Sequence, residues 1–153
     1  RCVWAWSPFS YALGSSVMPS YRDLLAWQLA RENALAIYRY ADRCWMPQRA
    51  APLDQLRRAA LSIQLNIAEG QASGPGPRCR FHLRVAHASA VETHDLLTFL
   101  QDLGADLDPM VVRSVRVQQL TYRLWKAIDD RSSIIDYLPM AVFVRTLPSS
   151  TPG

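Results

Sequence analysis

The strongest constraint on the fold lies in residues 56–70, LRRAALSIQLNIAEG, where apolar side chains recur every three or four positions. This spacing places one apolar stripe along an α-helix, formed by Leu56, Ala59 or Ala60, Ile63 and Ile67. A polar stripe follows the same period beside it and consists of Arg58, Ser62, Asn66 and Glu69. Gly70 is predicted to end the helix, because glycine readily adopts the left-handed conformation found at helix ends.

Helical spacing also precedes and follows this segment. A first helix is predicted from 21 to 45, with Ser20 able to cap its start. Its expected inward face holds Leu24, Trp27, Ala34, Leu35, Tyr38, Ala41 and Trp45. The second helix opens at Leu53, after a short connection bracketed by prolines. The stretch ASGPGP at 72–77 is predicted to be a loop, because alternating glycine and proline cannot continue a helix.

Two further helices complete the pattern. The third, at 81–103, has an expected inward stripe of Phe81, Val85, Ala88, Glu92, Leu96, Phe99 and Leu103. The fourth, at 108–128, is expected to face the core with Met110 or Val111, Val115, Leu120, Leu124 and Ile128. Four long helices joined by short loops predict an all-α fold, an antiparallel up-and-down four-helix bundle.

The bundle is predicted to occupy residues 19–130 as one domain. Residues 1–18 mix aromatic residues with proline, glycine and serine, which predicts an irregular N-terminal extension rather than a secretory signal. Residues 131–153 are predicted to form a C-terminal extension and flexible tail. Within them, SIIDYLPMAVFV at 133–144 fits either a short extension packed on the bundle or a strand.

Arginine dominates the charge of this chain, whose formal net charge is +4 and which contains a single lysine, Lys126. Residues 1–90 hold eleven arginines against five acidic residues, whereas residues 91–153 hold six basic residues against eight acidic ones. Arginine binds phosphate through a planar fork and stacks on bases, so a nucleic-acid partner is one explanation. A GC-rich coding sequence that favours arginine over lysine is the other.

The apolar stretches and the cysteines of this sequence bear on its cellular location. No stretch approaches the roughly 20 uninterrupted apolar residues of a membrane-spanning helix, so no membrane partner is expected. Cys2, Cys44 and Cys79 show neither CxxC spacing nor a nearby histidine that would complete a zinc site. They predict free thiols in a reducing cytoplasm.

Motifs for catalysis and metal binding are missing from the sequence. Glu69 and Glu92 lack a histidine three positions later, so the Glu-x-x-His pairs of di-iron bundles are absent. His87 and His94, seven positions apart, are expected to be packing or surface residues rather than metal ligands. Without a GxSxG elbow, a P-loop or a GxGxxG pattern, we expect a non-enzyme with no catalytic residue, metal or cofactor.

Three blocks resemble the signature segments of the bacterial four-helix-bundle proteins known from 23S rRNA intervening sequences. They are YRDLLAWQLA at 21–30, LRRAALSIQLNIAEG at 56–70 and FHLRVAHASAVETHDLL at 81–97. Gln64 stands where the family commonly has proline, and Ala88 stands where glycine is usual. Both residues are compatible with a helix.

The resemblance implies more than the spacing does. Members of the family resemble the accessory variability protein of diversity-generating retroelements, a basic, barrel-shaped homopentamer that binds a reverse transcriptase and nucleic acid. By this resemblance the chain is expected to assemble into a ring-shaped homo-oligomer, a pentamer, that presents arginines to RNA or DNA. No catalytic residues are established for the family.

Two sets of site residues follow. Candidates for nucleic-acid contact flank the connection between the second and third helices and are Arg57, Arg58, Arg78, Arg80 and Arg84. A polar seam between helices is predicted from Ser62, Asn66, Glu69, Ser89 and Glu92. Glu92 is expected to point into the bundle and to pair with Arg57 or Arg58. Alternatively the arginines form a solvated basic face, with one of that pair held by Glu92 or Glu69.

Together these residues predict a non-enzymatic, nucleic-acid-associated accessory or adaptor protein in the cytoplasm. It is expected to bind RNA or DNA phosphates and, by the resemblance, a reverse transcriptase. The alternative is a homo-oligomeric scaffold for protein assembly that has no role with nucleic acid.

Overall fold

The computed structural model describes the backbone of residues 20–143 and the side chains of residues 20–129. Its four α-helices are α1 (Leu25–Arg43), α2 (Ala50–Ala72), α3 (Pro77–Asp102) and α4 (Asp108–Phe143). Two short 3-10 turns, η1 (Tyr21–Asp23) and η2 (Pro47–Arg49), precede α1 and α2. No residue in the described range lies in a strand, so the predicted all-α class with four helices is confirmed.

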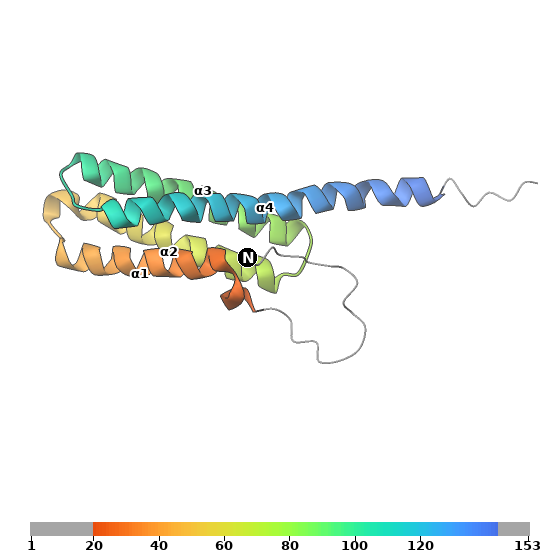
Figure 1. Ribbon diagram of the computed structural model, residues 1–153, viewed down its shortest axis with the longest axis horizontal. Helices are drawn as coiled ribbons and strands as arrows, with labels where there is room; N and C mark the ends of the chain where they lie inside the picture. The colour runs from red at the N-terminus through yellow and green to blue at the C-terminus, as the bar shows by residue number, and fades with distance from the viewer. Residues whose placement is uncertain (1–19, 144–153) are drawn as a thin grey trace, which may run out of the picture.

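Helix α4 is longer than the sequence predicts. It continues without a break to Phe143 and projects beyond the other three helices (Figure 1). The strand alternative for residues 133–144 is therefore wrong as far as Phe143. The predicted N-terminal extension at 1–18 and the last ten residues of the predicted tail lie outside the described residues.

The helices form a closed bundle in which each packs against two others. Helices α1 and α3 both contact α2 and α4, and the chain turns back at each connection (Figure 1). Polar pairs between α3 and α4 show their relative direction: His87 meets Thr121, and His94 meets Ser114. The residue numbers rise on α3 as they fall on α4, so these two helices run in opposite directions.

Ser20 fixes the start of the bundle. Its Oγ accepts a hydrogen bond from the Arg22 N–H at 3.3 Å, and Asp23 Oδ2 accepts one from the Ser20 N–H at 3.1 Å. This reciprocal capping box caps the N-terminus of η1 rather than that of α1, which begins at Leu25. Gln28 Nε2 then donates to the Arg22 carbonyl at 2.8 Å and ties η1 to the first turns of α1.

Helix α2 supplies the centre of the core, and its predicted apolar stripe is confirmed as buried. Two clusters of buried apolar side chains fill the bundle. One includes Ile37, Leu53, Leu56, Leu97, Leu100 and Leu107. The other includes Ala30, Ile63, Ile67, Ala86, Ala90 and Val117. Each buried leucine or isoleucine stabilises the fold by about 1.5–3 kcal/mol relative to an exposed one.

Gly70 does not end α2, contrary to the prediction from its sequence position. The helix continues to Ala72, and the Ser73 N–H bonds to the Glu69 carbonyl at 3.0 Å. Gly70 is buried, and a Cβ there would lie 3.3 Å from the Leu83 side chain and 3.4 Å from the Cys79 carbonyl oxygen. The glycine at position 70 therefore allows α3 to pack close to α2.

The inward face of α3 also differs from the prediction. Its buried residues are Cys79, Leu83, Ala86, Ser89, Ala90, Thr93, Leu97 and Leu100. Four members of the predicted stripe, Phe81, Ala88, Glu92 and Phe99, are instead exposed, and so is Leu103 after the helix. Both sets repeat at helical spacing, and spacing alone does not show which of them faces the core.

The predicted faces of α1 and α4 are correct only in part. In α1 the buried residues include Ala34 and Ala41, as predicted, together with Ala26, Ala30, Asn33 and Ile37, whereas Leu35 is exposed. In α4 the predicted Leu120 and Leu124 pack against the core, whereas Val115 is exposed.

We expect the substitution Gly70→Val to lower the free energy of unfolding by about 1–3 kcal/mol, because the added methyl groups would overlap Leu83 and the α3 backbone. Chemical denaturation followed by circular dichroism measures this change. Ala72→Val, at an exposed position two residues later, is the matched control and is expected to have little effect. Equal stability of the two variants would contradict the close approach.

Candidate nucleic-acid interface

The predicted polar seam lies between α2 and α3. Ser62 Oγ and Ser89 Oγ are 2.9 Å apart, and they join the two helices directly. Asn66 Nδ2 donates to Ser62 Oγ at 3.1 Å and to the Ser62 carbonyl at 2.9 Å. Each of these bonds contributes about 1 kcal/mol. The Ser62–Ser89 bond crosses between the helices and favours one register of α2 against α3, whereas the Asn66 bonds lie within α2 and hold Ser62.

His82 extends the seam, a role that was not predicted. Its Nδ1 lies 3.2 Å from Asn66 Oδ1 and 3.1 Å from Glu69 Oε2. Glu69 thus joins the seam through His82. A signal was present, because His82 and Ser89 are seven positions apart and therefore share a face of α3.

Glu92 lies outside this seam, and its predicted position inside the bundle is wrong. Its side chain is exposed and accepts a hydrogen bond from Gln55 Nε2. Gln55 Oε1 accepts in turn from Arg58 Nε and Nη2, at 3.1 and 2.6 Å. The predicted pairing of Glu92 with Arg57 or Arg58 is replaced by a chain from Arg58 through Gln55 to Glu92.

Arg57 serves to connect α2 with α1. Its Nη2 pairs with Asp42, its Nη1 lies 3.3 Å from Asp54 Oδ1, and its guanidinium carbon lies 5.7 Å from the centre of the Tyr38 ring. The Arg57 guanidinium thus contacts two carboxylates and an aromatic ring. Arg57 is therefore not available to phosphate without breaking these contacts.

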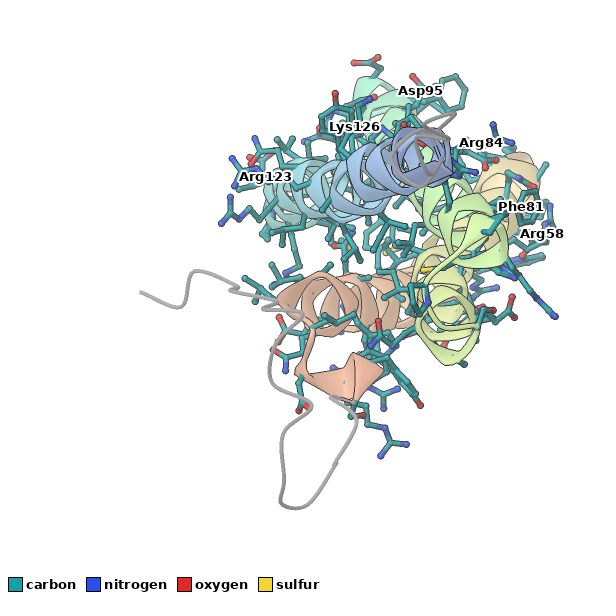
Figure 2. The ribbon with its side chains drawn as sticks, turned by 90° about the vertical axis from the view of Figure 1, so that its right-hand side faces the viewer. Arg58, Phe81, Arg84, Asp95, Arg123 and Lys126 are labelled. Carbon is teal, nitrogen blue, oxygen red and sulfur yellow. The ribbon has the colours of Figure 1, made fainter. Side chains whose placement is uncertain are left out.

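Arg78, Arg80 and Arg84 lie in the first three turns of α3. Arg78 and Arg84 are exposed, and neither has an ion pair with a carboxylate among residues 20–129. Arg80 is partly buried, with its Nη1 3.7 Å from Asp129 Oδ1. Arg58 projects on the same side of the bundle as Arg84 and Phe81, whereas Arg123 projects on the other (Figure 2).

Arg80 and Arg84, but not Arg78 or Arg58, border a shallow hollow between α3 and α4, with a volume of about 340 Å³. It is lined by Pro77, Arg80, Phe81, Arg84, Trp125 and Asp129. The hollow combines two guanidinium groups with two aromatic side chains. Such a surface suits a phosphate backbone and the bases next to it.

Helix α3 meets α4 through two histidines. His87 Nδ1 lies 3.3 Å from Thr121 Oγ1, and its ring stacks on Trp125 with a centroid distance of 5.9 Å. His94 Nδ1 lies 2.8 Å from Ser114 Oγ. Both histidines are thus packing residues, as predicted.

Within the part of the chain that the structure describes, no three His, Cys, Asp or Glu side chains lie close enough to hold a metal ion. Cys44 and Cys79 are free thiols, and burial raises the pKa of Cys79. None of the described helices is both long and apolar enough to span a lipid bilayer.

A comparison with protein families identifies the family of this chain. The model of the 23S rRNA-intervening sequence protein matches residues 22–108, more than half of the chain. The chain belongs to this family. The match begins in η1, includes all of α1, α2 and α3, and stops at the first residue of α4. No curated protein gives a significant match.

The family match contains every residue of the α2–α3 seam and all five candidate arginines. Trp125 and Asp129, which complete the hollow from α4, lie beyond it. The family relationship therefore covers the arginines of the surface but not the α4 wall of the hollow.

The α3–α4 contact predicts a pH dependence of stability. Burial lowers the pKa of His87 below its ordinary value near 6.5, so the unfolded chain takes up this proton more readily than the folded one. The contribution of His87 to the free energy of unfolding is fully present above pH of about 6.5 and is lost as the pH falls below that value. We expect His87→Gln to lose less stability than the wild type between neutral pH and pH of about 5. Urea denaturation at both pH values measures this, and equal losses would contradict the assignment.

Proposed function

We propose that this protein is a non-enzymatic accessory protein that binds RNA or DNA phosphates through the arginines at the start of α3. The observation that carries the proposal is the contrast between Arg57, which two carboxylates occupy, and Arg78 and Arg84, which are exposed without an ion pair among the described residues. A fold that neutralises one arginine and leaves others open suits an anionic partner.

The start of α3 adds a further attraction for phosphate. Its N-cap residue, Gly76, has no side chain to bond the first backbone N–H groups, and Pro77 occupies the first position of the helix. Free N–H groups and the positive end of the helix dipole favour anions. Because the family is named for intervening sequences of 23S rRNA, RNA is the favoured partner.

Self-association forms the second part of the proposal. Four large apolar residues on the outer side of the α3 segment are exposed, namely Phe81, Val91, Phe99 and Leu103. Exposed apolar patches of this kind commonly mark protein interfaces. We propose that Val91, Phe99 and Leu103, which lie outside the hollow, bury against further copies in a ring, a pentamer by the family resemblance, in which repeated arginine surfaces strengthen binding by multivalency.

The resemblance to the retroelement accessory protein extends the proposal to a reverse transcriptase as a protein partner, in the cytoplasm. The alternative function is a homo-oligomeric scaffold that binds proteins and no nucleic acid. The exposed apolar residues of α3 favour both functions, whereas the open arginines favour only the first.

We expect the double variant Arg78→Gln/Arg84→Gln to bind single-stranded RNA at least about tenfold more weakly than the wild type at low salt, because it loses two phosphate contacts. The slope of log affinity against log salt is expected to fall by about 1–2. Fluorescence anisotropy with a labelled RNA at several salt concentrations measures both quantities.

The matched control is Arg116→Gln/Arg123→Gln, which removes the same charge from two exposed positions on α4. Arg123 projects on the opposite side of the bundle from Arg84 (Figure 2). Equal weakening by both double variants would argue for a general charge effect. RNA binding that is absent or insensitive to salt in the wild type would favour the scaffold.

We expect Phe99→Glu to reduce the size of the assembly, because a carboxylate cannot be buried at an apolar interface without a partner. Analytical ultracentrifugation measures the mass. Val112→Glu, at a position on α4 that is 71% exposed, is the control and is expected to leave the mass unchanged. A folded Phe99→Glu variant with the wild-type mass would exclude this side of α3 from the interface.

A further inference from the structure

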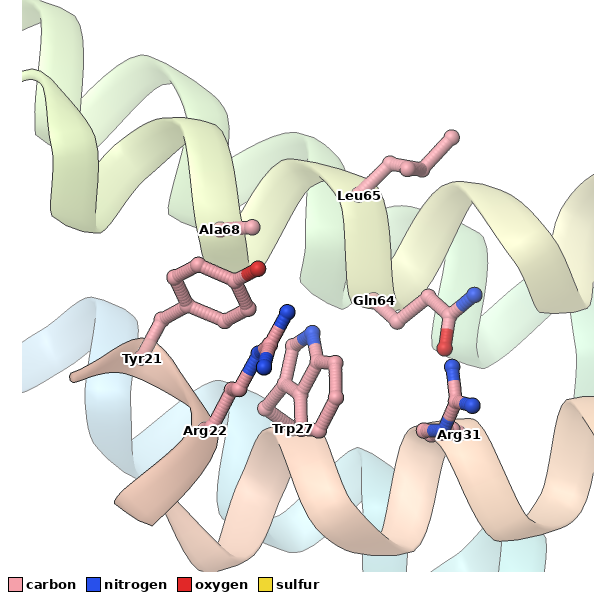
Figure 3. A pocket seen from close by; sticks show the side chains of 7 residues that line it. All are labelled: Tyr21, Arg22, Trp27, Arg31, Gln64, Leu65 and Ala68. Carbon is pink, nitrogen blue, oxygen red and sulfur yellow. The ribbon is translucent and has the colours of Figure 1, made fainter.

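A second hollow lies between the start of α1 and the second half of α2. Its volume is about 440 Å³, within the range of small-molecule sites. The side chains that give it chemical character are Tyr21, Arg22, Trp27, Arg31 and Gln64 (Figure 3). None of them belongs to the arginine surface of α3.

Two aromatic rings form one side of this hollow. Tyr21 and Trp27 meet edge to face, with centroids 5.3 Å apart and an angle of 66° between the ring planes. The Ser20 capping box and the bond from Gln28 to Arg22 hold η1 against α1, so the Tyr21 backbone is fixed. Trp27 packs against the second core cluster. The two rings are therefore held in fixed positions.

Two guanidinium groups rest on these rings. The guanidinium carbon of Arg22 lies 5.8 Å from the centre of the Tyr21 ring, and that of Arg31 lies 5.6 Å from the centre of the Trp27 ring. Figure 3 shows the Arg22 guanidinium next to the Tyr21 ring. Both arginines are exposed, and neither has an ion pair among residues 20–129. Their charge is therefore not neutralised within the described chain.

Gln64 supplies a group that lacks a hydrogen-bond partner. Its Oε1 is buried and accepts no bond from any described residue. In Figure 3 the carboxamide lies next to the Arg31 guanidinium. Buried polar atoms without partners are uncommon in proteins, and amide side chains bind the hydrogen-bonding edges of bases.

We propose that this hollow binds one nucleotide of a single-stranded nucleic acid. The base stacks on one face of the Trp27 ring, beside the Tyr21 ring that meets it edge to face, the phosphate binds Arg22 and Arg31, and Gln64 bonds to the edge of the base. Aromatic rings beside guanidinium groups are the usual surface for single strands, because every base has a flat face. A charge-assisted hydrogen bond from a guanidinium to phosphate is stronger than the present contact of that guanidinium with a ring. Replacing the ring contacts by phosphate contacts is therefore favourable.

The inference rests on the proposed function but uses different residues. The start of α1 and the α2–α3 connection lie at the same end of the bundle (Figure 1). A single strand that crosses this end can therefore contact the hollow and the α3 arginines together. Two such contacts on one strand raise the overall affinity beyond that of either alone.

The test compares two labelled probes, an oligouridylate of about ten nucleotides and an abasic ribose-phosphate chain of the same length. We expect the wild type to bind the oligouridylate at least about fivefold more tightly, because only this probe can stack. Trp27→Leu is expected to abolish that preference, and Trp27→Phe to retain most of it. Thermal melting checks that both variants fold.

The charges are tested separately. Arg22→Gln/Arg31→Gln is expected to weaken binding of both probes by about tenfold. Arg39→Gln/Arg43→Gln, at exposed positions further along α1, is the matched control and is expected to have a smaller effect. In addition, the indole N–H resonance of Trp27, assigned with Trp27→Phe, is expected to shift when the oligouridylate is added.

Three results would overturn the inference. One is equal affinity of the wild type for both probes, and a second is equal behaviour of the two double variants. The third is an equal shift of the Trp27 resonance by a phosphopeptide of the same charge, which would indicate a general phosphate site. If Arg78→Gln/Arg84→Gln still weakens RNA binding in any of these cases, the proposed function stands without this hollow. A wild type that binds neither probe would overturn both.

Discussion

The close approach of α2 and α3 is the constraint on which the rest of the bundle depends. A Cβ at Gly70 would touch Leu83 at 3.3 Å, and Ser62 and Ser89 are near enough to share a hydrogen bond. At position 70 no larger side chain fits this separation, because the Leu83 side chain fills the space that the glycine leaves. Helices α1 and α4 then close the bundle by packing against this pair, and the two core clusters fill the space between them.

The same constraint divides the polar residues of α2 and α3 between structure and surface. Asn66 and His82 are used within the seam, and Arg57 is held by α1, so none of them is open to a partner. Arg78 and Arg84 lie beyond the seam and remain exposed. The chain thus neutralises Arg57 where α1 and α2 meet and leaves Arg78 and Arg84 exposed near the α2–α3 connection, where a polyanion can approach without disturbing the core.

Periodicity identifies the buried face of a helix where one apolar stripe is clearly the longer. In residues 56–70 the stripe of Leu56, Ala59, Ala60, Ile63 and Ile67 is longer than that of Leu61, Leu65 and Ala68, and its burial was predicted correctly. Helix α3 carries two stripes, and periodicity cannot show which one faces inward. The stripe that contains Phe81 and Phe99 was chosen, but the stripe that contains Leu83, Leu97 and Leu100 is the buried one. Glu92 was misplaced for the same reason. The Ser62–Ser89 pair was anticipated because both residues adjoin the stripe that packs, whereas the part played by His82 was missed.

By itself, the sequence determined the number of helices, their order and the family, because these depend on local spacing, on proline and glycine positions, and on residues close together in the chain. Tertiary structure alone decided which face of α3 is buried, why Gly70 is required, which arginines stay open, and that Tyr21, Trp27 and Gln64 meet in one hollow. These features depend on the distance between helices. That distance follows from the packing of side chains far apart in the chain, which no local pattern contains.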